Sequence, residues 1–200
     1  MTLPSRMTIF NCRCSKDMII SLTGFMGCGK SSVGRKLSEL LCCPFADLDA
    51  VIEEQEGRKI AEIFETDGEE EFRKIEARTL EHLIRKPATG SDVHIESVLA
   101  LGGGAVMTPR CAEMVHEHTL CIYLRASADT LASHLEGEAG GRPLLKSSTT
   151  LQQHILNMMS LRTETYERTA HIIIDTDGKT INGIAEEINI SIFATNLFKR

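Results

Sequence analysis

Aromatic residues are scarce in this sequence, which has no tryptophan, two tyrosines and seven phenylalanines among 200 residues. A core of ordinary size must therefore be built mostly from Ile, Leu, Val, Met and Ala. No apolar run approaches the roughly 20 residues that a membrane-spanning helix needs, and residues 1–17 contain no apolar segment typical of signal peptides. We therefore expect a cytoplasmic protein with no membrane partner.

An excess of positive charge is also missing, because 22 Lys and Arg stand against 28 Asp and Glu and leave a net charge of -6. This balance argues against a nucleic-acid partner, which a basic surface would favour. The seven cysteines are irregularly spaced, so they favour reduced thiols in the cytoplasm over a disulfide framework. The length suits one domain with a sizeable core, and we expect a monomer.

Apolar runs alternate with helical patterns along the chain, which predicts an α/β fold with a parallel sheet. Strands are expected at 18–23, just before Asp47, and at 97–101, 120–124 and 171–174. Helices are expected at 30–42, over 51–86 with interruptions near Gly57 and Gly68, and at 109–116, 129–135, 151–168 and 181–190. We expect residues 18–193 to form a single domain, with a disordered extension at 1–17 and a tail at 194–200.

A phosphate-binding motif follows the first predicted strand. Residues 24–31 read Gly-Phe-Met-Gly-Cys-Gly-Lys-Ser, which matches the P-loop pattern of Gly, four residues and then Gly-Lys-Ser/Thr, between a strand and a helix. In such a loop the backbone N–H groups surround the phosphates, Lys30 reaches the outer phosphates, and the Ser31 hydroxyl holds Mg²⁺. The motif therefore predicts a nucleoside triphosphate as ligand and Mg²⁺ as cofactor. The expected nucleotide-binding residues are Gly27, Cys28, Gly29, Lys30, Ser31 and Ser32.

Cys28 lies inside this loop, where the N–H groups and Lys30 should lower the pKa of its thiol. A regulatory thiolate is one interpretation of such a residue. The simpler interpretation, which we favour, is a small side chain that the loop tolerates and that has no role.

A P-loop alone does not distinguish a GTPase, a motor ATPase and a small-molecule kinase, although a guanine-reading Asn-Lys-x-Asp motif is missing here. Asp47 and Asp49 follow the second predicted strand. Alternating residues on an extended segment face the same way, so both carboxylates can address one site, one at the Mg²⁺ shell and one at a hydroxyl. A solvated turn with a helix cap at Asp49 is an equally good interpretation.

Other residues bear on the second substrate. Arg73 and Arg162 lie in predicted helices and could grip a carboxylate, although a surface position is the simpler interpretation of either arginine alone. Gly102-Gly103-Gly104 ends a predicted strand, at the edge where α/β sheets bind ligands. Arg142 lies at 137–149, a segment with four Gly or Pro residues and no periodicity. We expect this segment to be a mobile lid whose arginine swings over the transferring phosphates, unless Arg142 is simply solvated.

Taken together, these motifs resemble those of the shikimate kinase family. They occur in the family's order and near its spacing, over residues 18 to about 190. The resemblance implies a three-layer α/β/α fold with a five-stranded parallel sheet of the P-loop, nucleoside-monophosphate-kinase type. It also implies a substrate-binding helical region at about 49–86 and a lid at about 137–149. The implied reaction transfers the γ-phosphoryl group of ATP to the 3-hydroxyl of shikimate, giving shikimate 3-phosphate in the pathway to chorismate and the aromatic amino acids.

The resemblance also implies roles for single residues on the phosphate side. Lys30 and Ser31 serve ATP and Mg²⁺, and Asp47 supports the metal. Arg142 contacts both the phosphate and the substrate. Lys30 and Arg142, together with Asp49, are the implied catalytic residues.

On the acceptor side, the resemblance implies that Asp49 contacts the shikimate hydroxyls and is the candidate base. Arg73 and Arg162 grip the shikimate carboxylate, and Gly103 offers its backbone to the ring. One departure concerns the helix after the fourth strand, where family members often carry an arginine near the adenine and this sequence has His134. A gluconate-kinase-like enzyme and a non-catalytic nucleotide-binding regulator are the alternative functions.

Overall fold

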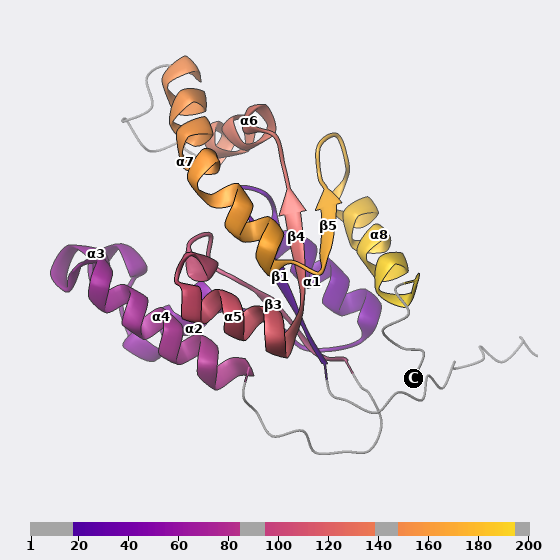
Figure 1. Cartoon of the computed structure of the whole chain (residues 1–200), viewed down its shortest axis with the longest axis horizontal. Coiled ribbons are helices and arrows are strands. Elements are labelled where there is room, and N and C mark those ends of the chain that lie inside the picture. Colours follow the sequence, from indigo (N-terminus) through magenta and orange to yellow (C-terminus); the bar gives the residue numbers. More distant parts are fainter. Residues whose placement is uncertain (1–17, 85–94, 139–147, 195–200) are drawn as a thin grey trace, which may run out of the picture.

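Five parallel strands form one sheet in the order β2-β3-β1-β4-β5 in the computed structural model of the protein, which describes residues 18–84, 95–138 and 148–194 (Figure 1). The strands are β1 (Met18–Thr23), β2 (Phe45–Asp47), β3 (Ile95–Ala100), β4 (Thr119–Arg125) and β5 (Ile172–Asp175). β1 lies at the centre and pairs in parallel with β3 and with β4. Because all strands run the same way, their carboxyl ends meet at one edge, which is where such sheets bind ligands.

Helices cover both faces of this sheet, as Figure 1 shows. The helices are α1 (Lys30–Leu41), α2 (Leu48–Glu56), α3 (Ile60–Thr66), α4 (Gly68–Ile84), α5 (Pro109–His118), α6 (Ala128–Glu138), α7 (Ser148–Thr169) and α8 (Ile181–Ala194), with a 3-10 turn, η1, at Ala105–Met107. The buried residues form two clusters, one on each face. The first joins the sheet to α1, α6 and α8, and the second joins it to α2, α4 and α5, while α7 contributes to both. The expected three-layer α/β/α fold with a five-stranded parallel sheet is confirmed.

The stretch expected to be helical over 51–86 consists of three helices, with breaks at the two expected glycines. Gly57 ends α2 with φ +68°, and Gly68 begins α4 with φ +83°. Glycine adopts these left-handed conformations without the steric cost that a side chain would bring. Local backbone chemistry therefore explains why one polar stretch folds as three separate helices.

Several expected boundaries were wrong. α6 continues to Glu138 and α7 begins at Ser148, so both ends of the expected 137–149 lid are helical, while residues 139–147, including Arg142, lie outside the described residues. α8 continues to Ala194, which was expected to begin the tail. Its buried Ile188 and Ile192 lie four residues apart, so the apolar face of the helix extends past the expected end. In the described part of the chain no helix is long and apolar enough to span a membrane.

Candidate functional site

The P-loop joins the buried end of β1 to the first residue of α1. Three of its glycines have positive φ: Gly24 (+144°), Gly27 (+79°) and Gly29 (+89°). A Cβ at Gly24 would lie 2.7 Å from the backbone oxygen of Leu124, so this position requires glycine for space as well as for conformation. α1 begins at Lys30, directly after this loop, and the positive end of the helix dipole therefore faces an anion held there.

A cavity of about 890 Å³ lies over this loop at the carboxyl edge of the sheet. The six P-loop residues predicted to bind the nucleotide line it, and so do Asp47, Asp49 and Gly103, whereas Arg142, the seventh predicted residue, lies outside the described residues. The rest of its wall comes from α6, from the β5–α8 connection and from neighbouring segments: Met26, Val33, Leu101, Ser133, His134, Thr176, Lys179, Thr180, Ile181 and Ile184. Residues predicted for the nucleotide and for the acceptor thus share one cavity.

Lys30 folds back over the loop that precedes it. Its Nζ donates to the backbone oxygens of Gly24 at 3.0 Å and Phe25 at 2.9 Å, and lies 4.0 Å from the Sγ of Cys28. The Cys28 side chain is buried in the apolar cluster against α1. Burial raises the pKa of the Cys28 thiol above its usual value, in spite of the opposing charge of Lys30. The expectation of a lowered thiol pKa was therefore wrong.

Asp47 links the P-loop helix to α2. Its Oδ2 accepts a 2.5 Å hydrogen bond from the Ser31 hydroxyl, and its Oδ1 accepts from the backbone N–H groups of Asp49 and Ala50. Asp47 is therefore the N-cap of α2, a position that Asp favours because its carboxylate satisfies free N–H groups. Asp49 lies inside the helix, so its expected place on an extended segment, or as a helix cap, was wrong. The strand-to-helix turn nevertheless leaves both carboxylates on the cavity wall.

Two carboxylates meet beside Gly102. A Cβ at Gly102 would lie 2.6 Å from Oδ1 of Asp49 and 3.1 Å from Oε1 of Glu76. Burial raises the pKa of Asp49, and the charge of Asp47 raises it further. Burial also raises the pKa of Glu76, although its hydrogen bond with Arg73 opposes the shift. Both carboxylates are therefore shielded from water, Asp49 in part and Glu76 almost fully, since only 1% of Glu76 is exposed.

Arg73 is held against the glycine segment by carboxylates on its own helix. Nη1 donates to Glu76 at 2.8 Å and Nη2 donates to Glu69 at 3.1 Å. A Cβ at Gly104 would lie 2.7 Å from both nitrogens, so the guanidinium packs directly over that glycine. Glu76 therefore orients Arg73, which is a role that we did not predict for it. Its position on the apolar face of α4, four residues after buried Phe72, was the signal that could have revealed it.

Arg162 and Tyr166 come from one face of α7, four residues apart. The Tyr166 hydroxyl donates to the backbone oxygen of Gly103 at 2.5 Å, and the Arg162 guanidinium carbon lies 5.8 Å from the centre of the Phe25 ring. Each residue of the Gly102-Gly103-Gly104 segment thus contacts a different group of the site. This explains three consecutive glycines, whereas a simple turn needs one or two. Neither Arg73 nor Arg162 is among the residues that line the described cavity.

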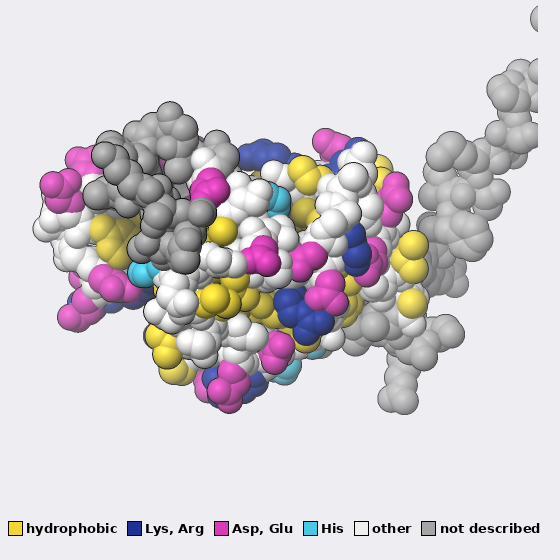
Figure 2. Space-filling view, turned by 90° about the horizontal axis from the view of Figure 1, so that it is seen from above, with side chains coloured by type: hydrophobic (Ala, Val, Ile, Leu, Met, Phe, Trp, Pro, Cys, Tyr) yellow, Lys and Arg dark blue, Asp and Glu magenta, His cyan; other side chains and the backbone are white. Residues whose placement is uncertain are grey.

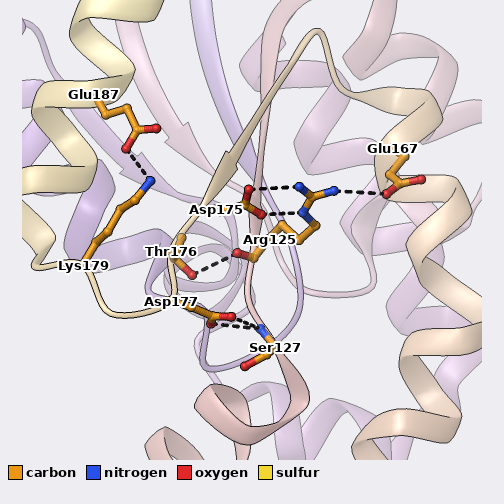
Figure 3. A network of polar contacts seen from close by, with 8 residues as sticks. All are labelled: Arg125, Ser127, Glu167, Asp175, Thr176, Asp177, Lys179 and Glu187. Atoms are coloured by element: carbon orange, nitrogen blue, oxygen red, sulfur yellow. Dashed lines mark hydrogen bonds and ion pairs between the residues drawn. The ribbon is translucent and has the colours of Figure 1, made fainter.

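The β5–α8 connection, on the far side of the cavity, is held to the end of β4 by hydrogen bonds and an ion pair (Figure 3). Arg125 donates to both carboxylate oxygens of Asp175, at 2.5 and 3.0 Å, and its backbone oxygen accepts from Thr176. The Asp177 carboxylate accepts from the backbone N–H of Ser127 at the start of α6. Because Thr176 lines the cavity, these contacts fix the wall opposite Asp49.

The comparisons with known proteins agree on one family. The family model described as shikimate kinase matches residues 26–192. The shikimate kinase of Geobacter sulfurreducens is 40% identical over 169 residues, covering 84% of this chain and 87% of that protein. The shikimate kinase of Chlorobium chlorochromatii is 38% identical over 181 residues, covering 87% and 90%.

Solved structures give the same result. The shikimate kinase of Acinetobacter baumannii, solved in complex with shikimate, superposes with a TM-score of 0.78 at 31% identity, covering 92% of this chain and 97% of that one. The shikimate kinase of Aquifex aeolicus superposes with a TM-score of 0.71 at 29% identity, covering 90% and 99%. The resemblance inferred from the sequence is thereby confirmed, and the chain belongs to the shikimate kinase family.

Proposed function

We propose that the protein transfers the γ-phosphoryl group of ATP to the 3-hydroxyl of shikimate and so forms shikimate 3-phosphate for the synthesis of chorismate and aromatic amino acids. The observation that carries this proposal is the shared cavity. It extends from the P-loop to Asp49 and Gly103, so a phosphate donor and a hydroxyl acceptor can share one cavity. Membership of the shikimate kinase family supports shikimate as the acceptor.

On the donor side, the N–H groups of the loop and Lys30 would hold the phosphates. The hydroxyl of Ser31 and the carboxylate of Asp47, which touch each other on the cavity wall, are hard oxygen donors of the kind that Mg²⁺ prefers. These two residues therefore fit the metal that the family implies. When bound there, Mg²⁺ would neutralise phosphate charge. Lys30 would leave its loop carbonyls for the phosphate oxygens, which attract its ammonium group more strongly.

On the acceptor side, Asp49 would orient the shikimate hydroxyl toward the γ-phosphate. Phosphoryl transfer passes through a loose transition state in which the proton leaves late, so we assign Asp49 mainly an orienting role. Arg73, which packs over Gly104, and Arg162, one turn of α7 before Tyr166, would hold the shikimate carboxylate. Arg142 lies outside the described residues, and its closure over the phosphates stays a prediction from the sequence.

A coupled assay of ADP release, run with shikimate and with gluconate, tests the proposal. We expect ADP release from ATP when shikimate is added and none when gluconate is added in its place. A Lys30→Ala variant should release no ADP and controls for contaminating kinases. Turnover of gluconate in place of shikimate would support the gluconate-kinase alternative. Tight ATP binding without turnover of either compound would support a non-catalytic regulator.

We further propose that the enzyme works as a cytoplasmic monomer without nucleic-acid or membrane partners. The net charge of -6 and the seven irregularly spaced cysteines support this setting. On the face drawn in Figure 2, Lys and Arg side chains lie among Asp and Glu and do not gather into a basic patch. Size-exclusion chromatography with light scattering would test the monomer.

A further inference from the structure

The P-loop rests on α6 at Gly27. A Cβ at Gly27 would lie 3.1 Å from Cγ of Leu135 and 3.8 Å from the backbone oxygen of Leu131. The backbone oxygen of Gly27 lies 2.8 Å from Nδ1 of His134. These three residues of α6 are spaced by three and four positions, so they share one face of the helix. One turn of α6 therefore supports the loop at a glycine with left-handed φ.

The direction of the hydrogen bond to Gly27 is determined by its chemistry. A backbone oxygen can only accept, so His134 donates from Nδ1. Lys30 donates to the loop oxygens of Gly24 and Phe25, whereas His134 donates to the loop oxygen of Gly27. A trans peptide points its C=O and the following N–H in opposite directions. Holding the Gly27 carbonyl therefore also orients the N–H of Cys28, which closes the turn of the loop on Phe25 at 3.3 Å.

We propose that His134 is a positioning residue for the nucleotide phosphates. By holding the Gly27 carbonyl toward α6, it keeps the curl of the loop in which the N–H groups face an anion. This inference rests on the proposed function, because it takes a nucleotide as the ligand of the cavity. His134 acts in this way through the loop, and its contribution does not depend on which base the nucleotide carries.

Two variants and one control test this role. His134→Ala removes the donor, whereas His134→Asn places an amide N–H close to the position of Nδ1. His82→Ala is the matched control, because His82 is also an exposed histidine on a helix but lies in the last turn of α4. Dissociation constants would be measured for ADP and for inorganic tripolyphosphate by displacement of a fluorescent ADP analogue.

His134→Ala should weaken both ligands by the same factor, roughly threefold to tenfold, which corresponds to the loss of one neutral hydrogen bond. His134→Asn should restore both affinities to within about twofold of the wild-type values, and His82→Ala should change neither. In steady-state kinetics, His134→Ala should raise the KM for ATP and leave the KM for shikimate unchanged.

Weakened ADP binding with unchanged tripolyphosphate binding would mean that His134 contacts the base, and would overturn the inference. Unchanged binding of both ligands, or failure of His134→Asn to restore them, would overturn it as well. Failure of the proposed function has a different signature. A wild-type protein that binds both ligands but phosphorylates no shikimate would refute the function and leave the His134 comparison valid, whereas one that binds neither ligand would refute both.

Discussion

Gly104→Ala should weaken the binding of shikimate without unfolding the protein. Gly104 has φ −107°, a conformation that alanine adopts without strain. The added Cβ would, however, lie 2.7 Å from Nη1 and Nη2 of Arg73 and 3.0 Å from its Cζ. Since these atoms end a flexible side chain, we expect the guanidinium to move away while the backbone stays in place.

The size of this movement follows from the contact distance. Ordinary van der Waals contact of a Cβ begins at 3.4 Å, so the guanidinium nitrogens must move by at least 3.4 − 2.7 = 0.7 Å. A movement of this size takes a bidentate contact with a carboxylate out of alignment. A lost hydrogen bond to a charged group costs about 1.5–3 kcal/mol, which is roughly a 10- to 150-fold increase in the KM for shikimate. kcat should change little, because the carboxylate is gripped equally before and during the transfer.

The assay varies shikimate at saturating ATP, with thermal unfolding as the control for stability. Removal of a glycine lowers the freedom of the unfolded chain by about 0.4–1 kcal/mol, so Tm should not fall. A double-mutant cycle separates an effect through Arg73 from a direct clash with the substrate. In the Arg73→Ala background, Gly104→Ala should have no further effect on KM. An unchanged KM in the single variant, or an equal increase in both backgrounds, would refute the reasoning.

The remaining predicted roles should separate in kinetic measurements. Arg142→Ala should mainly lower kcat, by on the order of 10³ for a loop arginine that neutralises transition-state charge, whereas Arg73→Ala should mainly raise the KM for shikimate; the opposite partition would contradict both roles. Asp47→Asn should raise the Mg²⁺ concentration needed for half-maximal rate, and an unchanged Mg²⁺ titration would remove Asp47 from the metal site. Burial raises the pKa of Asp49 above the ordinary aspartate value of about 3.9, so its carboxylate takes up a proton at a higher pH than an exposed aspartate does. As the pH is lowered, kcat/KM should therefore begin to fall while the pH is still above about 3.9. That fall should be missing from Asp49→Asn, whose rate should be about 10²-fold lower, and its persistence would assign the titration to another group.

Features whose cause is local could be predicted from the sequence. The P-loop is one, because its glycines, lysine and serine act through the backbone of a few adjacent residues. The breaks at Gly57 and Gly68 are another, because a left-handed residue ends or begins a helix whatever surrounds it. The strand order follows less directly, since the apolar runs predict five strands of a parallel sheet but not the order β2-β3-β1-β4-β5 in which they pair.

Features that depend on distant partners were missed or mispredicted from the sequence. Tyr166 contacts Gly103 across 63 residues, and nothing near either residue indicates the pairing. The pKa of Cys28 was mispredicted because the sequence shows the adjacent charge of Lys30 but not the burial of the thiol, which is a property of the whole fold. Glu76 was overlooked because a glutamate on α4 resembles its exposed neighbours unless its place on the apolar face is examined.

The turn between Asp47 and Asp49, which was not predicted, explains how one short segment can serve two reactants. Had both residues lain on an extended strand, their carboxylates would have pointed the same way, toward one site. Because Asp47 caps α2, the chain turns between them, and their oxygens reach different neighbours. Asp47 contacts Ser31 at the start of the P-loop helix, while Asp49 contacts the Gly102 position beside buried Glu76. The turn thus places one carboxylate at the expected metal and phosphate side and the other at the expected hydroxyl side. This division suits the proposed transfer between two bound reactants, because each carboxylate can then serve a different one of them.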